Sequence, residues 1–159
     1  MEIPVQLLPK TLTVFVGRPG SGKTTILTNI AARFQNESVQ FVDTEGVPRE
    51  YFPKNAVAKT DFDLSSYPII VLIDNIEIVM RKGFHLEEIK DNAITEKQIV
   101  IATMGVLPQT RLSKDHISFL NESQLASIDN LLYIWKDELH IIKARYPLDE
   151  RYSRKLRQL

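Results

Sequence analysis

The chain has 159 residues, of which 43% are hydrophobic, and it carries 20 basic and 20 acidic side chains. This size and hydrophobic fraction predict one compact domain, and the balanced charge does not indicate nucleic acid or an anionic membrane as a partner. The absence of cysteine excludes disulfides and thiolate metal sites. The longest purely aliphatic run, Ile69 to Ile73, is too short to span a bilayer, and the first residues lack a signal-peptide core. We therefore expect a cytoplasmic protein with no membrane contact.

Strand and helix patterns alternate along the first two thirds of the chain. Strands are expected at residues 12–16, at 39–46, where the strand ends in acidic residues and glycine, and at 69–74 and 98–103, whose apolar runs are typical of buried strands. Apolar side chains recur at helical spacing in residues 25–34 and 83–97. This order predicts an α/β fold with a mostly parallel sheet. In such sheets ligands bind beyond the carboxyl ends of the strands, so the residues that follow each strand are the candidate functional residues.

The last third has weaker patterns. Residues 104–129 predict a mobile loop and a short helix, and residues 130–146 predict two strands around a tight turn at Lys136 and Asp137. Residues 148–159 form a polar, basic tail. We expect residues 1–159 to form a single domain that ends in this tail.

The stretch "GRPGSGKT", Gly17 to Thr24, joins the first predicted strand to the first predicted helix and matches G-x-x-x-x-G-K-[ST] at every fixed position. Its glycines permit a sharp backbone path that turns N–H groups toward phosphate. Lys23 supplies a positive charge for the outer phosphates, and Thr24 offers a hydroxyl to Mg²⁺. An ordinary helix cap is the alternative, which the flanking strand and helix disfavour. The predicted nucleotide-binding residues are Gly17, Arg18, Pro19, Gly20, Ser21, Gly22, Lys23, Thr24 and Thr25.

Two acidic residues follow later predicted strands. Asp74 ends "IIVLID" and is placed to hold Mg²⁺ together with Thr24, because a phosphate-bound Mg²⁺ needs a carboxylate nearby. Glu45, in "DTEG", is placed to orient and deprotonate the water that attacks the γ-phosphate. The alternatives are a strand-end cap for Asp74 and a turn cluster for Glu45.

Together, "GRPGSGKTT", "FVDTEG", "IIVLID" and "LHIIKARYPLD" resemble the RecA-like ATPase core, and within it the branch of the archaeal RadA and RadB and eukaryotic recombinases. The resemblance covers about Leu12 to Leu148. It implies a three-layer P-loop NTPase fold around a mostly parallel central sheet, ATP and Mg²⁺ as cofactors, and Glu45 as the catalytic base. Lys23 then acts on the phosphates during hydrolysis.

The same resemblance gives a role to Lys143 and Arg145. In RecA, bacterial RadA and KaiC relatives, a K-x-K/R pair on a late strand reaches the nucleotide of the neighbouring subunit. Residues two apart share a face of a strand, so both cations are expected to point the same way and to act as catalytic residues in trans. The alternative is a salt bridge within the chain, for instance to Asp149 or Glu150.

The sequence departs from the family pattern in two places, and both departures affect the activity that we expect. We expect no amino-terminal polymerisation segment, because the chain starts close to its first predicted strand. The polar sensor usually found after the fourth strand is replaced by "IATMG", in which Thr103 can substitute and Met104 cannot. We therefore expect a core-only ATPase, weak or dependent on a partner, that serves as an accessory factor in DNA recombination or repair. The alternatives are a small-molecule P-loop kinase and a KaiC-like nucleotide-dependent interaction module.

Expected partners are a protein partner or further copies of the chain, together with single-stranded DNA. Arg111 and Lys114 lie where the family binds single strands. Four basic residues of the tail could also contact phosphates, and a solvated tail is the alternative: Arg151, Arg154, Lys155 and Arg157.

Overall fold

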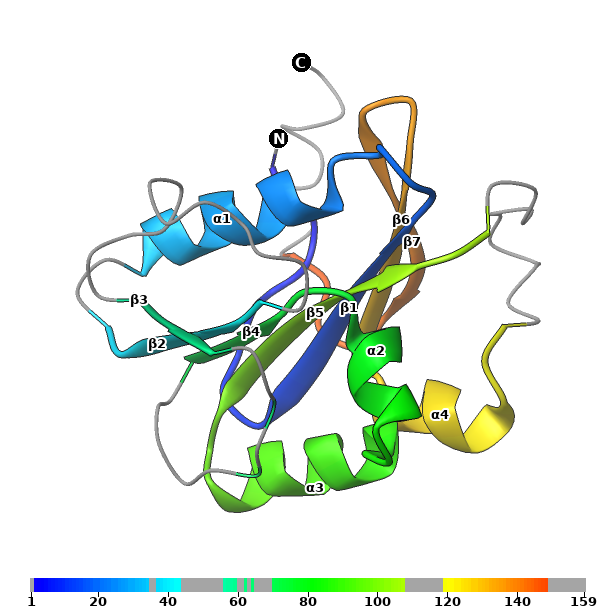
Figure 1. Ribbon diagram of the computed structural model, residues 1–159. Coiled ribbons are helices and arrows are strands. Elements are labelled where there is room, and N and C mark those ends of the chain that lie inside the picture. The colour runs from blue at the N-terminus through cyan, green and yellow to red at the C-terminus, as the bar shows by residue number, and fades with distance from the viewer. Residues whose placement is uncertain are drawn as a thin grey trace.

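The computed structural model describes residues 2–34, 37–43, 56–59, 62, 64, 70–107 and 119–148. Within these residues the chain forms a seven-stranded sheet in the order β3–β2–β4–β5–β1–β6–β7 (Figure 1). The strands are β1 (Thr11–Gly17), β2 (Val39–Val42), β3 (Ala56–Lys59), β4 (Ile70–Ile73), β5 (Ile99–Gly105), β6 (Asn130–Trp135) and β7 (Glu138–Ala144). The helices are α1 (Lys23–Arg33), α2 (Ile76–Arg81), α3 (Leu86–Thr95) and α4 (Glu122–Ser127).

The pairing of the described strands confirms a mostly parallel sheet. All neighbouring pairs are parallel except β6 and β7, which are antiparallel. Gly17 pairs with Gly105, so β1 and β5 end at the same level, and Val42 pairs with Ile73, so β2 and β4 do as well. The segments that follow these strands therefore meet at one edge of the sheet, where ligands bind in open α/β folds.

Helices cover both faces of the sheet and make three layers, as predicted. Figure 1 shows α1 on one face and α2, α3 and α4 on the other. Side chains alternate along β1, so that Phe15 faces α1 while Val14 and Val16 face the opposite layer. The largest buried side chains of the α1 layer are Phe15, Leu27, Ile30, Phe41, Ile70, Leu72 and Ile101.

Several predicted helices and strands are present in the structure, although their first and last residues differ from the predicted ones. The tight turn between β6 and β7 is confirmed, and positive φ angles of 50° at Lys136 and 61° at Asp137 are those of a type I′ hairpin turn. The short helix predicted within residues 104–129 is α4. Strand β3 and helix α2, which are four and six residues long, were not predicted.

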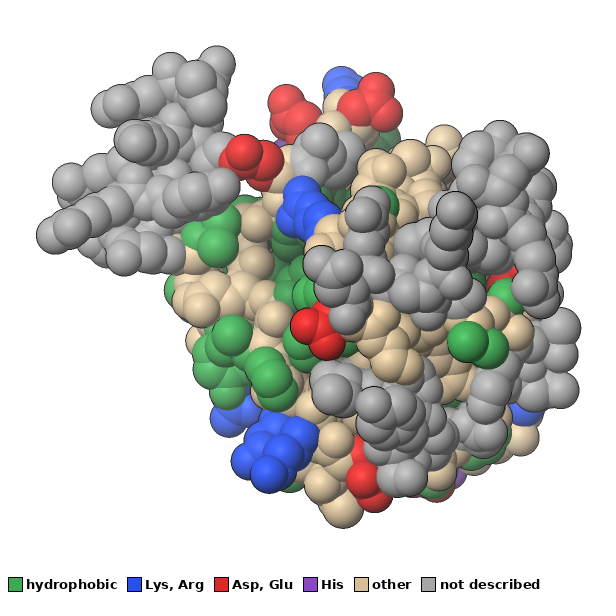
Figure 2. All heavy atoms as spheres, turned by 90° about the vertical axis from the view of Figure 1, so that its left-hand side faces the viewer, with side chains coloured by type: hydrophobic (Ala, Val, Ile, Leu, Met, Phe, Trp, Pro, Cys, Tyr) green, Lys and Arg blue, Asp and Glu red, His purple; other side chains and the backbone are tan. Residues whose placement is uncertain are grey.

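Several predictions fall on residues outside the described part of the chain: Glu45, Arg111, Lys114 and the tail from residue 149 onward. On the face shown in Figure 2, the basic and acidic side chains of the described residues lie in separate small groups, and no single basic patch covers that face. Among the described helices, none has the length and apolar character needed to cross a bilayer.

Candidate functional site

The loop from Gly17 to Thr24 connects β1 to α1 at the carboxyl edge of the sheet. Gly20 and Gly22 have φ angles of 76° and 92°, which L side chains rarely adopt. A Cβ at Gly17 would collide with the Ser21 hydroxyl and would lie 3.0 Å from Lys23 Cγ. A larger residue at Gly17 would force the Ser21 and Lys23 side chains to shift, and glycine is favoured at the other two positions by backbone conformation.

Ser21 and Lys23 are the polar side chains of this loop that suit an anion. The Ser21 hydroxyl is buried and has no hydrogen-bond partner among the described residues. Lys23 Nζ donates to the Arg18 carbonyl oxygen of its own loop at 3.0 Å. Buried polar groups are normally satisfied, so an unpaired hydroxyl beside a lysine held by a carbonyl oxygen fits a loop that binds an anion such as phosphate.

A cavity of about 670 Å³, here called the loop cavity, opens over this segment. Its size lies in the range of small-molecule sites. Gly17, Arg18 and Ser21 are not among its lining residues, and the other predicted loop residues are. The lining consists of Pro19, Gly20, Gly22, Lys23, Thr24, Thr25, Asn75, Glu77, Arg81, Gly105, Val106, Leu107 and Phe119.

The predicted magnesium ligands lie together. The Thr24 hydroxyl donates to Asp74 Oδ2 at 3.1 Å, although the two residues are 50 positions apart in the chain. Asp74 is fully buried at the end of β4. A carboxylate held against the hydroxyl of a phosphate-binding loop is the donor set that Mg²⁺ prefers, so these two residues fit the ion.

Thr103 does not occupy the position expected of a phosphate sensor. It is fully buried, and its hydroxyl donates to Asp74 Oδ1 at 2.8 Å while accepting from the Asn75 backbone N–H at 2.9 Å. It therefore fixes the orientation of the Asp74 carboxylate from behind and does not line the loop cavity.

Glu77 is a candidate site residue that the sequence analysis missed. It lies in the first turn of α2 and lines the loop cavity. Burial raises the pKa of its carboxyl group, while the backbone N–H groups of Glu77 and Gly105 and the charges of Lys23 and Arg81 act in the opposite direction. The available signal was its place one helical turn after Asp74, in "DNIE".

Glu45 lies outside the described residues, but the strand before it is described. The Asp74 backbone N–H donates to the Val42 carbonyl oxygen at 3.0 Å, and Asp43 follows directly. The last described residue before Glu45, Asp43, therefore follows a strand that ends beside the end of β4.

Lys143 and Arg145 lie at the opposite, amino-terminal edge of the parallel strands, and both have partners within the chain. Arg145 Nη1 pairs with Asp129 Oδ1 at 3.1 Å, and Lys143 Nζ donates to the Leu125 carbonyl oxygen at 2.8 Å. Both cations therefore have an acceptor within the chain, at Asp129 and near the end of α4. The alternative of a salt bridge within the chain is found for Arg145, with Asp129 as the acid. The action on a neighbouring subunit stays a prediction.

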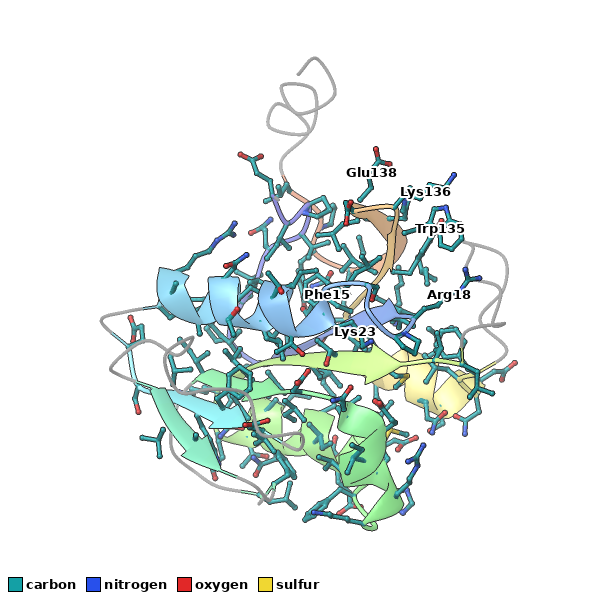
Figure 3. The ribbon with its side chains drawn as sticks, turned by 45° about the horizontal axis from the view of Figure 1, so that its top comes forward. Phe15, Arg18, Lys23, Trp135, Lys136 and Glu138 are labelled. Carbon is teal, nitrogen blue, oxygen red and sulfur yellow. The ribbon has the colours of Figure 1, made fainter. Side chains whose placement is uncertain are left out.

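Arg18 connects the loop to the β6–β7 hairpin. Its guanidinium lies 4.5 Å from the ring centre of Trp135, in the range of a cation–π contact, and Lys136 Nζ lies 5.9 Å from the same ring. Figure 3 shows the Trp135 side chain between Arg18 and Lys136. The side chain of Arg18 therefore points away from the loop cavity and ties the loop to the end of β6.

The strand order, the glycine-rich loop after β1 and the carboxylate after β4 define the α/β fold of the RecA-like P-loop NTPases. Two solved structures share it. FlaH, a flagellar accessory protein of Methanocaldococcus jannaschii, is 17% identical over 87% of this chain and 80% of its own, with a TM-score of 0.58. A DnaB-like replicative helicase is 15% identical, with a TM-score of 0.64, over 87% of this chain and 53% of its own.

At these identities the likeness shows the fold alone, and this chain spans about half the length of the helicase. No protein-family model matches the chain, and no curated protein does.

Proposed function

We propose that this protein binds ATP with Mg²⁺ and hydrolyses it. The observation that carries the proposal is the loop itself. Lys23 lines a cavity of about 670 Å³, and the Ser21 hydroxyl of the same loop is buried with no hydrogen-bond partner among the described residues. Thr24 lines the same cavity, and its hydroxyl lies 3.1 Å from the buried carboxylate of Asp74. A bound phosphate would pair with Ser21 and Lys23, and Mg²⁺ would pair with Thr24 and Asp74.

Each residue has one task in this proposal. The loop N–H groups and Lys23 bind the phosphates, and Thr24 and Asp74 hold Mg²⁺, which supplies charge neutralisation when bound. Thr103 keeps Asp74 oriented. Glu45, by the resemblance to the recombinase branch, takes the proton of the attacking water.

Calorimetry with Lys23→Ala tests nucleotide binding. A hydrogen bond from a charged group contributes about 1.5–3 kcal/mol, so ATP affinity should fall at least tenfold. Arg33→Ala is the matched control, since it removes a cation from the other end of α1, and it should bind as the wild type does. Equal ATP affinity in the Lys23 variant would contradict the loop assignment.

Glu45→Gln tests hydrolysis separately from binding. A general base contributes about a hundred- to ten-thousand-fold to the rate, so this variant should keep its ATP affinity and lose turnover. Turnover at the wild-type rate would show that another residue is the base.

We further propose that the ATPase is an accessory factor in DNA recombination or repair, with "FVDTEG" as the motif that supports this narrower role. ATP turnover should then rise on addition of single-stranded DNA, more at low than at moderate salt. No binding of single strands even at low salt would favour the nucleotide-dependent interaction module, and phosphate transfer to an added small molecule would favour the kinase.

A further inference from the structure

A second cavity, here called the side cavity, adjoins the loop cavity. Its volume is about 360 Å³, which suits a small molecule. Met104 is buried at the end of β5, and the other apolar side chains of the lining pack against the hydrophobic core. The side cavity is therefore formed by the packed interior of the domain. Its apolar lining consists of Met80, Met104, Val106, Phe119 and Leu120.

Arg81 lies at the border between the two cavities and lines both of them. Its side chain is exposed and forms no hydrogen bond or ion pair with another described residue. Glu77, one helical turn earlier in α2, interacts with it through charge alone. In the proposed function the phosphates bind to the loop and to Lys23, so the guanidinium of Arg81 is available to a different anion. The lining residues that the two cavities share are Glu77, Arg81, Gly105, Val106 and Phe119.

The lining of the side cavity defines the chemistry of a matching ligand. Apolar walls favour an apolar body, because its burial removes apolar surface from water. The guanidinium at the border favours an anionic group, which it can bind through two parallel N–H bonds. Glu77 lies beside this cation, so a single anionic group fits better than several. Met80 and Met104 are two of the three methionines of the chain, and their flexible thioether side chains can adapt to an irregular ligand.

We propose that the side cavity binds a small amphipathic acid, with its apolar body against Met80, Met104 and Leu120 and its acidic group on Arg81. We also propose that this ligand weakens the binding of ATP, a part that rests on the proposed function. The two ligands are both anions and lie in adjoining cavities that share Arg81, so each repels the other. Coupling of this kind is reciprocal, and ATP therefore weakens the binding of the acid by the same factor.

Anilinonaphthalenesulfonate is a suitable probe, because it combines an aromatic body with one sulfonate group. Phenylnaphthylamine, the same molecule without the sulfonate, is the matched uncharged control. The chain is labelled at its methionine methyl groups for NMR, and Met80→Leu and Met104→Leu assign the two signals. The charged probe should shift both signals without ATP present, and the uncharged one should bind more weakly.

Three variants test the contacts. Leu120 lines the side cavity but not the loop cavity, so Leu120→Glu should weaken probe binding at least about tenfold, because a charge is placed against an apolar ligand. Its ATP affinity should stay within about twofold of the wild type. Ile94→Glu makes the same exchange at a position that is 44% exposed on α3 and outside both cavities, and it should bind the probe as the wild type does. Arg81→Ala should weaken the charged probe about two- to fivefold and leave the uncharged one unchanged.

Four results would overturn the proposed site. They are unmoved Met80 and Met104 signals at saturating probe, an unchanged probe affinity in Leu120→Glu, an equal effect of Arg81→Ala on the two probes, and the same methyl shifts with ATP alone. The last result would mean that the nucleotide itself occupies the side cavity.

Competition measurements test the coupling. Saturating ATP with Mg²⁺ should raise the Kd of the charged probe at least about fivefold, and the saturating probe should raise the Kd of ATP by the same factor. Unchanged constants would overturn the antagonism. A wild-type protein that binds no ATP would overturn the proposed function, whereas the probe measurements without ATP would still decide whether the side cavity is a binding site.

Discussion

Asp129 connects three elements at the amino-terminal edge of the parallel strands. It is 1% exposed, and its Oδ2 accepts from the Leu12 backbone N–H at 2.8 Å and from Lys90 Nζ at 2.6 Å. Its Oδ1 accepts from Arg145 Nη1 at 3.1 Å. The start of β1, helix α3 and the segment after β7 therefore depend on one buried carboxylate, which makes Asp129→Asn an informative perturbation.

The cost of Asp129→Asn follows from the burial of its partners. Asparagine retains an oxygen for the Leu12 N–H but leaves Lys90, whose side chain is 12% exposed, without a counter-charge. Breaking a buried pair by removing one partner costs about 3–5 kcal/mol. For a domain of this length 1 kcal/mol corresponds to about 2–4 °C in Tm, so Tm should fall by about 6–20 °C. Arg145→Ala should cost clearly less than Asp129→Asn, because that side chain is 56% exposed and exposed ion pairs contribute little to stability.

Urea unfolding, followed by far-UV circular dichroism and by the fluorescence of Trp135, the single tryptophan of the chain, measures these differences. Coincident transitions would support a two-state comparison. Asp91→Asn, an exposed acid on α3, is the control and should change stability by less than about 0.5 kcal/mol. A loss below about 1 kcal/mol in Asp129→Asn, or an equal loss in Arg145→Ala, would refute the reasoning from burial.

Three further outcomes are expected. Asp74→Asn should raise the Mg²⁺ concentration needed for ATP binding, and unchanged metal titration curves would leave Asp74 as a strand-end cap. Binding of ATP should change the fluorescence of Trp135, because Arg18 of the phosphate-binding loop stacks on its ring. Arg18→Ala should abolish that fluorescence change without abolishing ATP binding. An undiminished fluorescence change in this variant would show that the Arg18–Trp135 contact does not cause it. Wild-type turnover per molecule should rise with protein concentration if Lys143 and Arg145 act in trans. Their double alanine variant should lose that dependence, whereas a flat wild-type profile would make the pair structural.

The sequence by itself determined the phosphate-binding loop. All residues of that loop lie within Gly17 to Thr24, so its geometry depends on neighbours in the chain and on glycine conformations that no other residue adopts readily. The pairing of Thr24 with Asp74 was also predictable across 50 residues, because parallel strands bring their carboxyl ends to one edge. Alternating apolar runs were sufficient to predict the layers and the direction of most strands.

Only the tertiary structure decided which side chains surround these residues. Hydrophobic periodicity reports burial but does not identify the partners of a polar group, so it could not show that Thr103 binds Asp74 or that Arg145 pairs with Asp129. Hydrophobic periodicity also could not identify Glu77 as a site residue. Its place in a six-residue helix carries no periodic signal, and its burial beside Gly105 of β5 depends on long-range packing.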